Sequence, residues 1–256
     1  MRNIRLTLQY DGTNYNGWQA QRSGVVTLQG MLEEKLKEIT GGDTDVIAAG
    51  RTDAGVHALM QAASFRTASA LPSGVIKRAL NSILPDDVRV IDACEADEGF
   101  HPRYDAKSKT YFYLISHAHV LSPFLSRYAW KVPYRLDHGG MEHALSSLKG
   151  THDFSALRGS GCGAKSPVRT ILGITLERLD ALDFLGTKLS GDFFRISVEA
   201  DGFLRHMVRN IVGTAVEVGR GRNAPEDIAR ILGSKDRRLA GPTAPARGLF
   251  LEKVTY

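Results

Sequence analysis

Gly50-Arg51-Thr52-Asp53-Ala54-Gly55-Val56-His57 is the stretch around which the rest of the chain is organised. An apolar run over 46–49 precedes it, and a second one over 58–65 follows it. Its glycines bracket an arginine, a threonine and an aspartate, and glycine lets a backbone turn sharply or approach another group closely. The segment is therefore typical of a tight loop between two strands. Its aspartate is either a turn residue that bonds its own backbone or a carboxylate presented for chemistry.

The composition is that of a soluble globular protein. Of the 256 residues, 43% are hydrophobic and 24% are charged, which is enough apolar material for one large domain or two smaller ones. The chain has 33 Lys and Arg residues against 28 Asp and Glu residues, a net charge of +5. A basic surface attracts polyanions, so this mild excess is compatible with a nucleic-acid partner without establishing one.

Neither a metal centre nor a disulfide framework is indicated. The two cysteines, Cys94 and Cys162, lie far apart and form no C-x-x-C pair. His117 and His119 alternate along an expected strand, with no nearby carboxylate or cysteine to complete a metal-binding set. The sequence has no apolar run of membrane length and no signal-peptide pattern at its start. We therefore expect a cytoplasmic protein with no metal site and no membrane association.

Strand and helix patterns alternate along the whole chain. In the first hundred residues, alternating apolar positions predict strands and 3.6-residue spacing predicts helices, in the order strand 4–10, helix 28–39, strands 46–49 and 58–65, helix 73–83 and strand 88–93. The same patterns continue with strand 110–115, helix 141–148, strands 171–179 and 193–198, helices 204–218 and 225–233, and strand 248–256. These patterns predict two strand-and-helix halves of similar size, residues 1–104 and 105–256.

Two familiar catalytic motifs are absent from the sequence. The stretch from Gly159 to Ser166 resembles a phosphate-binding loop, but Ala164 stands where a glycine must precede Lys-Ser. No Gly-x-Ser-x-Gly elbow occurs, which argues against a serine hydrolase. What remains is a set of arginines and aromatic residues around Asp53.

Tyr111 and Arg209 are the notable members of that set, and each has an ordinary explanation. Tyr111 lies on an expected strand, where most tyrosines belong to the core. Arg209 lies three and seven residues before Val212 and Val216, at the edge of the apolar stripe of its helix, where its stem could simply cover the core. Arginines in glycine-rich or aromatic segments can also hold RNA phosphates while aromatic rings stack on bases. Those arginines are Arg22, Arg51, Arg103, Arg158, Arg169, Arg205 and Arg209.

Five further stretches accompany the loop along the chain. They are Tyr10-Asp11-Gly12 through Gly17-Trp18-Gln19, Phe100-His101-Pro102-Arg103-Tyr104-Asp105-Ala106, Lys109-Thr110-Tyr111-Phe112-Tyr113, Ser166-Pro167-Val168-Arg169 and Phe203-Leu204-Arg205-His206-Met207-Val208-Arg209-Asn210. Together with the loop, and in this order, they resemble the tRNA pseudouridine synthase A family over nearly the whole chain. Six ordered motifs, one of them eight residues long, make chance agreement very improbable.

The resemblance implies an isomerase that converts uridine to pseudouridine at positions 38, 39 and 40, in the anticodon stem and loop of tRNA. It implies an α+β (mixed α/β) fold of two similar halves, with mostly antiparallel mixed sheets flanked by helices and a positively charged catalytic cleft between the halves. It further implies a homodimer in which one tRNA touches both subunits, with no DNA partner.

Residue roles follow from the same resemblance. Asp53 matches the catalytic aspartate, Tyr111 the active-site tyrosine, and Arg209 the basic residue that pairs with the aspartate. The expected substrate-binding residues are Tyr111, Arg51, His57, Arg22, Arg103, Arg169 and Arg205. Pro102 and Arg205 depart from the family pattern, in which a small residue and a histidine are frequent at these positions. Neither departure touches the catalytic trio, so only local RNA contacts are affected.

A carboxylate suits this reaction, because it is ionised near neutral pH and can bond covalently and then leave. The sequence is compatible with attack on the sugar, attack on the base, or removal of a sugar proton, and the chemistry requires no metal or redox cofactor. Two other classes of protein compete with the synthase. One is an RNA-binding protein without catalysis, in which Asp53 is a turn residue. The other is a nucleoside or glycoside hydrolase, which usually needs a second carboxyl group, and no other carboxylate lies in a comparable loop.

Overall fold

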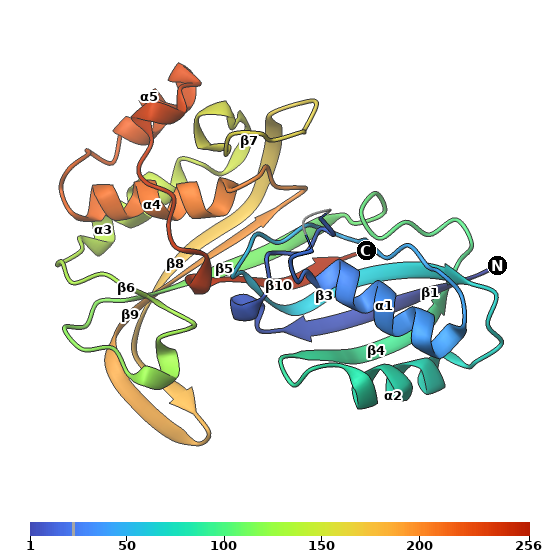
Figure 1. The fold of residues 1–256 in the computed structure, drawn as a ribbon. Helices are drawn as coiled ribbons and strands as arrows, with labels where there is room; N and C mark the ends of the chain where they lie inside the picture. Colours follow the sequence, from blue (N-terminus) through green and yellow to red (C-terminus); the bar gives the residue numbers. More distant parts are fainter. Residues whose placement is uncertain (22–23) are drawn as a thin grey trace. The chain divides into compact units, whose positions relative to one another are not determined.

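A computed structural model describes residues 1–21 and 24–256 and divides the chain into two compact units. The first unit consists of Met1–Lys107 together with Phe250–Tyr256, and the second is Ser108–Leu249 (Figure 1). The described residues form ten strands and five α-helices, so the prediction of an α+β fold is confirmed. None of the helices in the described ranges is long and apolar enough to cross a membrane.

The first unit is built on a mixed sheet with the strand order β4-β1-β3-β10. Its strands are β1 (Arg2–Tyr10), β2 (Ile47–Ala48), β3 (His57–Thr67), β4 (Val88–Ala96) and β10 (Leu249–Thr255). The central strand β1 is antiparallel to both β3 and β4, and the short β2 pairs with the other edge of β3. The last strand, β10, runs parallel to β3, with Phe250 opposite His57 and Leu251 opposite Ala58.

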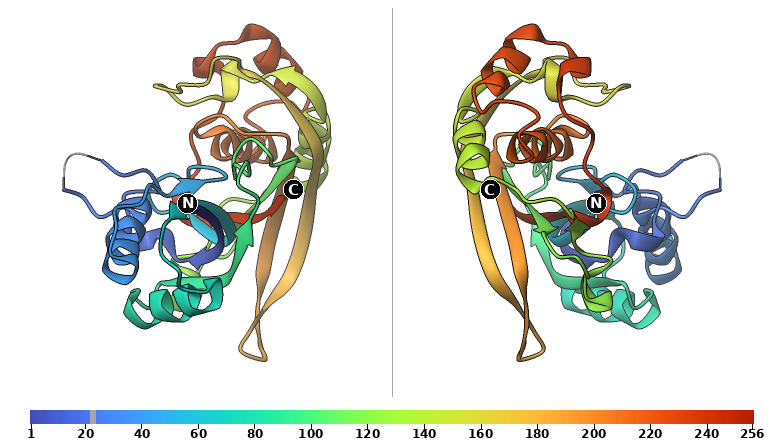
Figure 2. Two further views of the ribbon diagram at one scale, coloured as in Figure 1. Left: turned by 90° about the vertical axis from the view of Figure 1, so that its right-hand side faces the viewer. Right: turned by 90° about the vertical axis from the view of Figure 1, so that its left-hand side faces the viewer.

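Two helices, α1 (Leu28–Thr40) and α2 (Ser73–Ile83), cover one face of this sheet (Figure 2). In β1 every second residue from Ile4 to Leu8 is buried, whereas the residues between them reach solvent. This alternation is the expected result of one covered face. The helix α1 is capped at its start by Thr27, whose hydroxyl accepts the N–H of Gly30 at 3.3 Å. It is capped at its end by Gly41, which has a left-handed conformation.

The second unit contains an antiparallel sheet with the order β5-β9-β8-β7. The strands of this sheet are β5 (Ser108–Ser116), β7 (Gly150–Asp153), β8 (Val168–Phe184) and β9 (Thr187–Ala200), and the short β6 (Trp130–Lys131) pairs parallel with β5. The long hairpin of β8 and β9 closes through Leu185 and Gly186, which both have positive φ, at 54° and 78°. Two successive positive φ values are what a two-residue hairpin turn of type I′ requires.

Three helices belong to this unit: α3 (His138–Ser146), α4 (Met207–Gly219) and α5 (Asp227–Ser234). The helix α4 is buried at every position except Arg209 and Glu217, and it packs against α3, where Gly219 lets the Met141 side chain approach closely. Apolar spacing predicted this helix from Leu204. It begins three residues later because His206 adopts a left-handed conformation with φ 61°.

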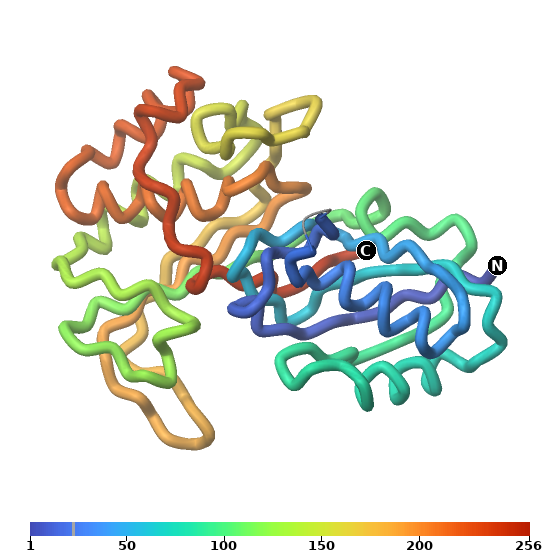
Figure 3. The backbone as a smooth tube through the Cα atoms, in the orientation of Figure 1, coloured from blue at the N-terminus to red at the C-terminus, as the bar shows by residue number. Residues whose placement is uncertain are grey.

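The ends of several elements differ from the sequence-based expectation. The strand β5 stops at Ser116, so His117 and His119 lie in the loop after it and do not alternate along a strand. The sequence pattern placed strand 248–256 in a half that begins at residue 105. In the structure the strand is β10, and its residues from Phe250 onward belong to the first unit, because their backbone pairs with β3 (Figure 3).

We expect Leu251→Ala to lower the free energy of unfolding of the first unit by about 2–5 kcal/mol, because this side chain is fully buried on β10. Lys253→Ala on the same strand is the control and should change it by less than about 0.5 kcal/mol. The first unit contains one tryptophan, Trp18, and the second unit contains the other, Trp130. In a Trp130→Phe background, urea unfolding followed by Trp18 fluorescence reports on the first unit alone. Equal midpoints for the two variants would contradict the assignment of β10 to this unit.

Candidate active site

Asp53 lies in the loop between β2 and β3, at the sheet edge of the first unit. Along this loop Arg51 and Ala54 are exposed, Thr52 is buried and Asp53 is partly exposed. The loop is therefore held to the unit by Thr52, while Asp53 keeps contact with solvent.

The backbone of this loop lies directly against the backbone of 12–18. The N–H of Trp18 donates to the carbonyl of Thr52 at 3.0 Å, and the N–H of Gly55 donates to the carbonyl of Tyr15 at 3.4 Å. Gly17 has φ +87°, and a Cβ at this position would lie 2.8 Å from the Thr52 carbonyl oxygen. Only glycine combines that conformation with so close an approach.

Gly12 makes a second contact of the same kind. A Cβ on Gly12 would lie 2.0 Å from the carbonyl oxygen of Val56, so this position also excludes a side chain. The same segment holds the start of α1, since the carbonyls of Gly17 and Trp18 accept the N–H groups of Leu28 and Gln29 at 3.2 and 2.9 Å. These N–H groups lie in the first turn, where a helix offers no partner of its own.

Beneath the loop, three buried polar side chains form a hydrogen-bonded group. The hydroxyl of Tyr10 lies 2.8 Å from Oγ1 of Thr52, and Nε2 of Gln61 donates to the same phenol oxygen at 3.3 Å. Nε2 of Gln61 also donates to the carbonyl of Gly50 at 2.8 Å. Burial raises the pKa of Tyr10 to about 12, against the two hydrogen bonds to its oxygen, so this hydroxyl stays protonated at neutral pH.

His57 is buried inside the first unit. Its Nδ1 accepts the N–H of Gly12 at 3.1 Å and lies 3.0 Å from Oδ1 of Asp11, while its ring stacks on Phe250 at a centroid distance of 4.6 Å. These contacts tie β3 to β10 and to the turn after β1. The substrate-binding role of His57 stays a prediction, and the ring makes internal contacts.

In the second unit, Tyr111 and Tyr113 lie on the same face of β5. Tyr111 is 6% exposed, and its ring meets that of Phe203 edge-on at 5.0 Å. The hydroxyl of Tyr113 donates to the carbonyl of Pro245 at 2.7 Å. Burial raises the pKa of Tyr113, and the positive charges of Arg209 and Arg247 act in the opposite direction. The helix that carries Arg209 and this strand therefore share one electrostatic environment.

Arg209 lies in the first turn of α4 and makes two hydrogen bonds to Ala244, in the segment that follows α5. Its Nε donates to the carbonyl of Ala244 at 2.7 Å, and its own carbonyl accepts the N–H of Ala244 at 3.1 Å. The segment approaches α4 closely because a Cβ on Gly213 would lie only 1.7 Å from the carbonyl oxygen of Pro242. A guanidinium bonded in this way has a set direction, unlike one that merely covers the core edge.

The next residue of α4, Asn210, is fully buried and connects three segments. Its Nδ2 donates to the carbonyl of Leu157 at 2.8 Å, and its Oδ1 accepts from the hydroxyl of Thr243 at 2.7 Å and from Nη2 of Arg237 at 3.0 Å. Thr243 precedes the residue that holds Arg209. The side chain of Asn210 thus holds the backbone at Thr243 and Ala244, and Ala244 in turn holds Arg209.

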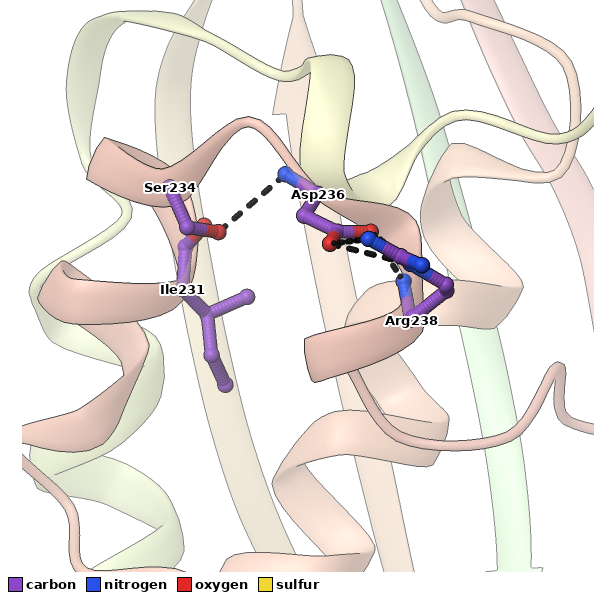
Figure 4. Close-up of polar contacts among 4 residues, drawn as sticks. All are labelled: Ile231, Ser234, Asp236 and Arg238. Carbon is purple, nitrogen blue, oxygen red and sulfur yellow. Dashed lines mark hydrogen bonds and ion pairs between the residues drawn. The ribbon is translucent and has the colours of Figure 1, made fainter.

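Arg237 reaches Asn210 from the short turn after α5. Figure 4 shows how that turn is set: Oγ of Ser234 accepts the N–H of Asp236 at 3.1 Å, and the guanidinium of Arg238 engages both oxygens of the Asp236 carboxylate, the shortest contact being 2.7 Å. The bonds from Arg238 lower the pKa of Asp236 to about 2. This carboxylate is therefore ionised at neutral pH and well below it.

Three arginines surround the loop that follows the short helix at Ser155–Leu157. Nη1 of Arg205 donates to the carbonyl of Ser160 at 3.1 Å. Burial acts to raise the pKa of the Cys162 thiol, but backbone N–H groups of Ala164 and Arg205 and the charges of Arg158 and Arg169 outweigh it, so the pKa is lowered. Positive charges of three arginines thus lie at this loop.

The predicted site residues are distributed over both units. Asp53, Arg51, His57 and Arg103 belong to the first, and Tyr111, Arg209, Arg169 and Arg205 to the second. Arg103 is exposed, with its guanidinium 5.8 Å from the ring centre of Tyr104. Arg22 lies outside the described residues. Within residues 1–21 and 24–256, no three His, Cys, Asp or Glu side chains gather in a way that could hold a metal ion.

Comparison with known proteins identifies the family. A family model described as tRNA pseudouridine synthase matches residues 7–105 and 144–256. The chain belongs to this family. It is similar over its full length to tRNA pseudouridine synthase A of Thermodesulfovibrio yellowstonii and of Thermoanaerobacter pseudethanolicus, each 44% identical over 256 residues with 100% of both chains covered. The enzyme of the same name from Acetivibrio thermocellus is 45% identical, again with 100% of both chains covered.

Five residues that support the expected trio were not predicted from the sequence: Tyr10, Thr52, Gln61, Asn210 and Arg237. One signal was present: Gln61 is an amide inside an apolar run, and Asn210 directly precedes the apolar pair Ile211 and Val212. Buried amides of this kind need hydrogen-bond partners, which marks them as members of a network without naming the partners.

We expect Gly17→Ala to destabilise the first unit by about 1–3 kcal/mol more than Gly24→Ala does. Both glycines have positive φ, so both variants carry the strain of a left-handed alanine, about 1 kcal/mol. A Cβ on Gly24 meets no atom within 4 Å, whereas a Cβ on Gly17 meets the Thr52 carbonyl. Urea unfolding of the two variants measures the difference, and equal losses would show that the loop can move away at no cost.

Proposed function

We propose that this protein isomerises uridine to pseudouridine in the anticodon arm of tRNA, at positions 38, 39 and 40, with Asp53 as the nucleophile. The observation that carries the proposal is the full-length similarity to enzymes named tRNA pseudouridine synthase A, together with the placement of Asp53. This carboxylate is partly exposed on a loop whose backbone is fixed from two sides.

The reaction detaches uracil from the ribose at its N1 nitrogen, rotates the base, and rejoins it through C5. The hydrogen on C5 leaves to solvent, and N1 ends with a proton, so no oxidant or reductant takes part. A carboxylate with an ordinary pKa of about 3.9 is ionised at neutral pH and can form and release a covalent bond. Attack on the sugar, attack on the base and removal of a sugar proton are all compatible with these residues.

Arg209 and Tyr111 supply the other two roles in this proposal. A guanidinium near Asp53 would keep the carboxylate ionised where the flipped nucleotide excludes water. The double tie to Ala244 supports this role, since it gives the guanidinium a set direction. Tyr111 would offer its ring to the uracil and its hydroxyl for a late proton transfer. Its packing against Phe203 would keep that ring in place.

RNA docking would rest mainly on phosphate contacts by arginines. A stacked target base must leave the helix before it can react, which costs a few kcal/mol. Contacts to phosphates can offset this cost. The arginines proposed for them are Arg22, Arg51, Arg103, Arg158, Arg169 and Arg205, of which three surround the positively charged loop around Cys162. By the same family resemblance, the working form would be a cytoplasmic homodimer that uses both subunits to hold one tRNA.

We expect the wild-type protein to release tritium from tRNA labelled at uracil C5, because pseudouridine formation displaces that hydrogen. Asp53→Ala should reduce the release to background while the dissociation constant for tRNA changes by less than about threefold, since only the reacting group is removed. Asp45→Ala, an exposed aspartate before β2, is the control and should retain the wild-type rate.

Three outcomes of this assay separate the possible functions. Binding without release by the wild type would indicate an RNA-binding protein, and release of free uracil would indicate a hydrolase. An active Asp53→Ala variant would remove this residue from the mechanism.

Arg169→Ala and Arg205→Ala should each weaken tRNA binding several-fold and reduce the slope of log affinity against log salt by about 1, the signature of one lost phosphate contact. Arg230→Ala is the matched control, because this exposed arginine is already paired with Asp227 at 3.0 Å. Filter binding or fluorescence anisotropy at several salt concentrations measures the slopes. An unchanged slope for both test variants would remove this cluster from the RNA-docking surface.

A further inference from the structure

We propose that Tyr10, Gln61 and Thr52 form a positioning device that sets the direction of Asp53 from beneath its loop. The proposal rests on Asp53 being the reacting carboxylate of the proposed function. None of the three need touch the RNA: they are 3%, 0% and 6% exposed, and they act through the backbone of the loop.

The two hydrogen bonds of Gln61 have a defined direction. The carbonyl of Gly50 can only accept, so the atom of Gln61 that lies 2.8 Å from it must be the amide nitrogen. The same nitrogen donates to the phenol oxygen of Tyr10 at 3.3 Å. The hydroxyl of Tyr10 and Oγ1 of Thr52 lie 2.8 Å apart, and either of them can donate in this hydrogen bond. The chain of hydrogen bonds runs from the amide of Gln61 through the phenol of Tyr10 to Thr52.

This arrangement fixes the loop on both sides of Arg51 and immediately before Asp53. Gly50 is held through its carbonyl, and Thr52 is held through its side chain by Tyr10 and through its carbonyl by Trp18. The carbonyl of Asp53 accepts the N–H of Val56 at 3.1 Å, which closes the turn on the other side. The carboxylate thus leaves a backbone with little freedom to rotate. A displacement of about 1 Å at a reacting group can cost about a hundredfold in rate.

Stability alone does not account for three polar groups at this place. Buried polar groups cost free energy unless all their hydrogen bonds are made. Within residues 1–21 and 24–256, Oε1 of Gln61 has no hydrogen-bond partner. An apolar side chain of similar size would avoid that cost, whereas the amide provides two directed bonds to the loop and to Tyr10.

The test compares Thr52→Val and Tyr10→Phe, which keep the shape of each side chain and remove its hydroxyl. Each variant should lower kcat for tritium release by about tenfold to a hundredfold and leave KM for tRNA within about twofold, because alignment is lost and RNA contacts are kept. Thr52→Ser keeps the hydroxyl and should restore kcat to within about threefold of wild type. Thr67→Val is the matched control: this threonine is 4% exposed at the far end of β3, its hydroxyl accepts one N–H, and its kcat should be unchanged.

Two further readouts separate positioning from other roles. The double variant Tyr10→Phe/Thr52→Val should be no slower than the slower single variant, since both changes break the same hydrogen bond. The pH dependence of kcat should keep its shape in Tyr10→Phe, because a phenol with a raised pKa of about 12 does not titrate in the assay range. A shifted profile would instead make Tyr10 a proton donor and would overturn the proposal.

Hydrogen exchange tests the same idea without any activity. In Thr52→Val and Tyr10→Phe the amides of Trp18 and Val56, which bond to the loop, should exchange at least about tenfold faster than in wild type, and in Thr67→Val they should not. Unchanged exchange, or an unchanged kcat in folded variants, would overturn the positioning role. If the wild type releases no tritium, the proposed function fails on its own, and the exchange rates still decide whether this group holds the loop.

Discussion

The contact on which the first unit depends most is one of backbone against backbone. The segment from Gly12 to Trp18 lies so close to the loop carrying Asp53 that no side-chain carbon fits between them. Hydrogen bonds from Trp18 and to Tyr15 then lock the two segments together. The main chain on either side of Asp53 is thereby fixed, and this fixes the point from which its carboxylate extends.

In the second unit, close backbone packing holds the cationic side chain of Arg209 in a similar way. Gly213 allows the segment at Pro242 to lie on α4, and that segment bonds Arg209 through both its side chain and its carbonyl. The buried amide of Asn210 fixes the segment in turn, and Arg237 donates to neutral oxygens of Asn210, Thr243 and Ala240. Burial lowers the pKa of Arg237, which shows that the environment resists its charge. Polar groups in this core therefore hold backbone segments in place at some cost.

Sequence patterns predicted those elements of the structure that depend on residues close together in the chain. The alternation in β1, the helical spacing of α1 and α2, and the loop between two strands could all be read from the sequence, because each depends on neighbouring residues. The partners of Gln61 and Asn210 could not be read in this way, since their hydrogen bonds join positions far apart in the chain. The same limit applies to β10, whose residue pattern indicates a strand and leaves its neighbour undefined. His206 shows a third limit. The apolar helical spacing begins at Leu204, but the left-handed backbone of His206 delays the start of α4 to Met207.

The return of β10 to the first unit has a consequence for the order of events during synthesis. The ribosome makes Met1–Lys107 first, but β10, which pairs parallel with β3, emerges only after the entire second unit has been translated. Until then the edge of β3 that β10 will cover is open, and the ring of His57 lacks the Phe250 ring on which it stacks. An open strand edge is a site for wrong pairing. The edge of β3 at His57 and Ala58 is therefore completed only after the second unit has been translated.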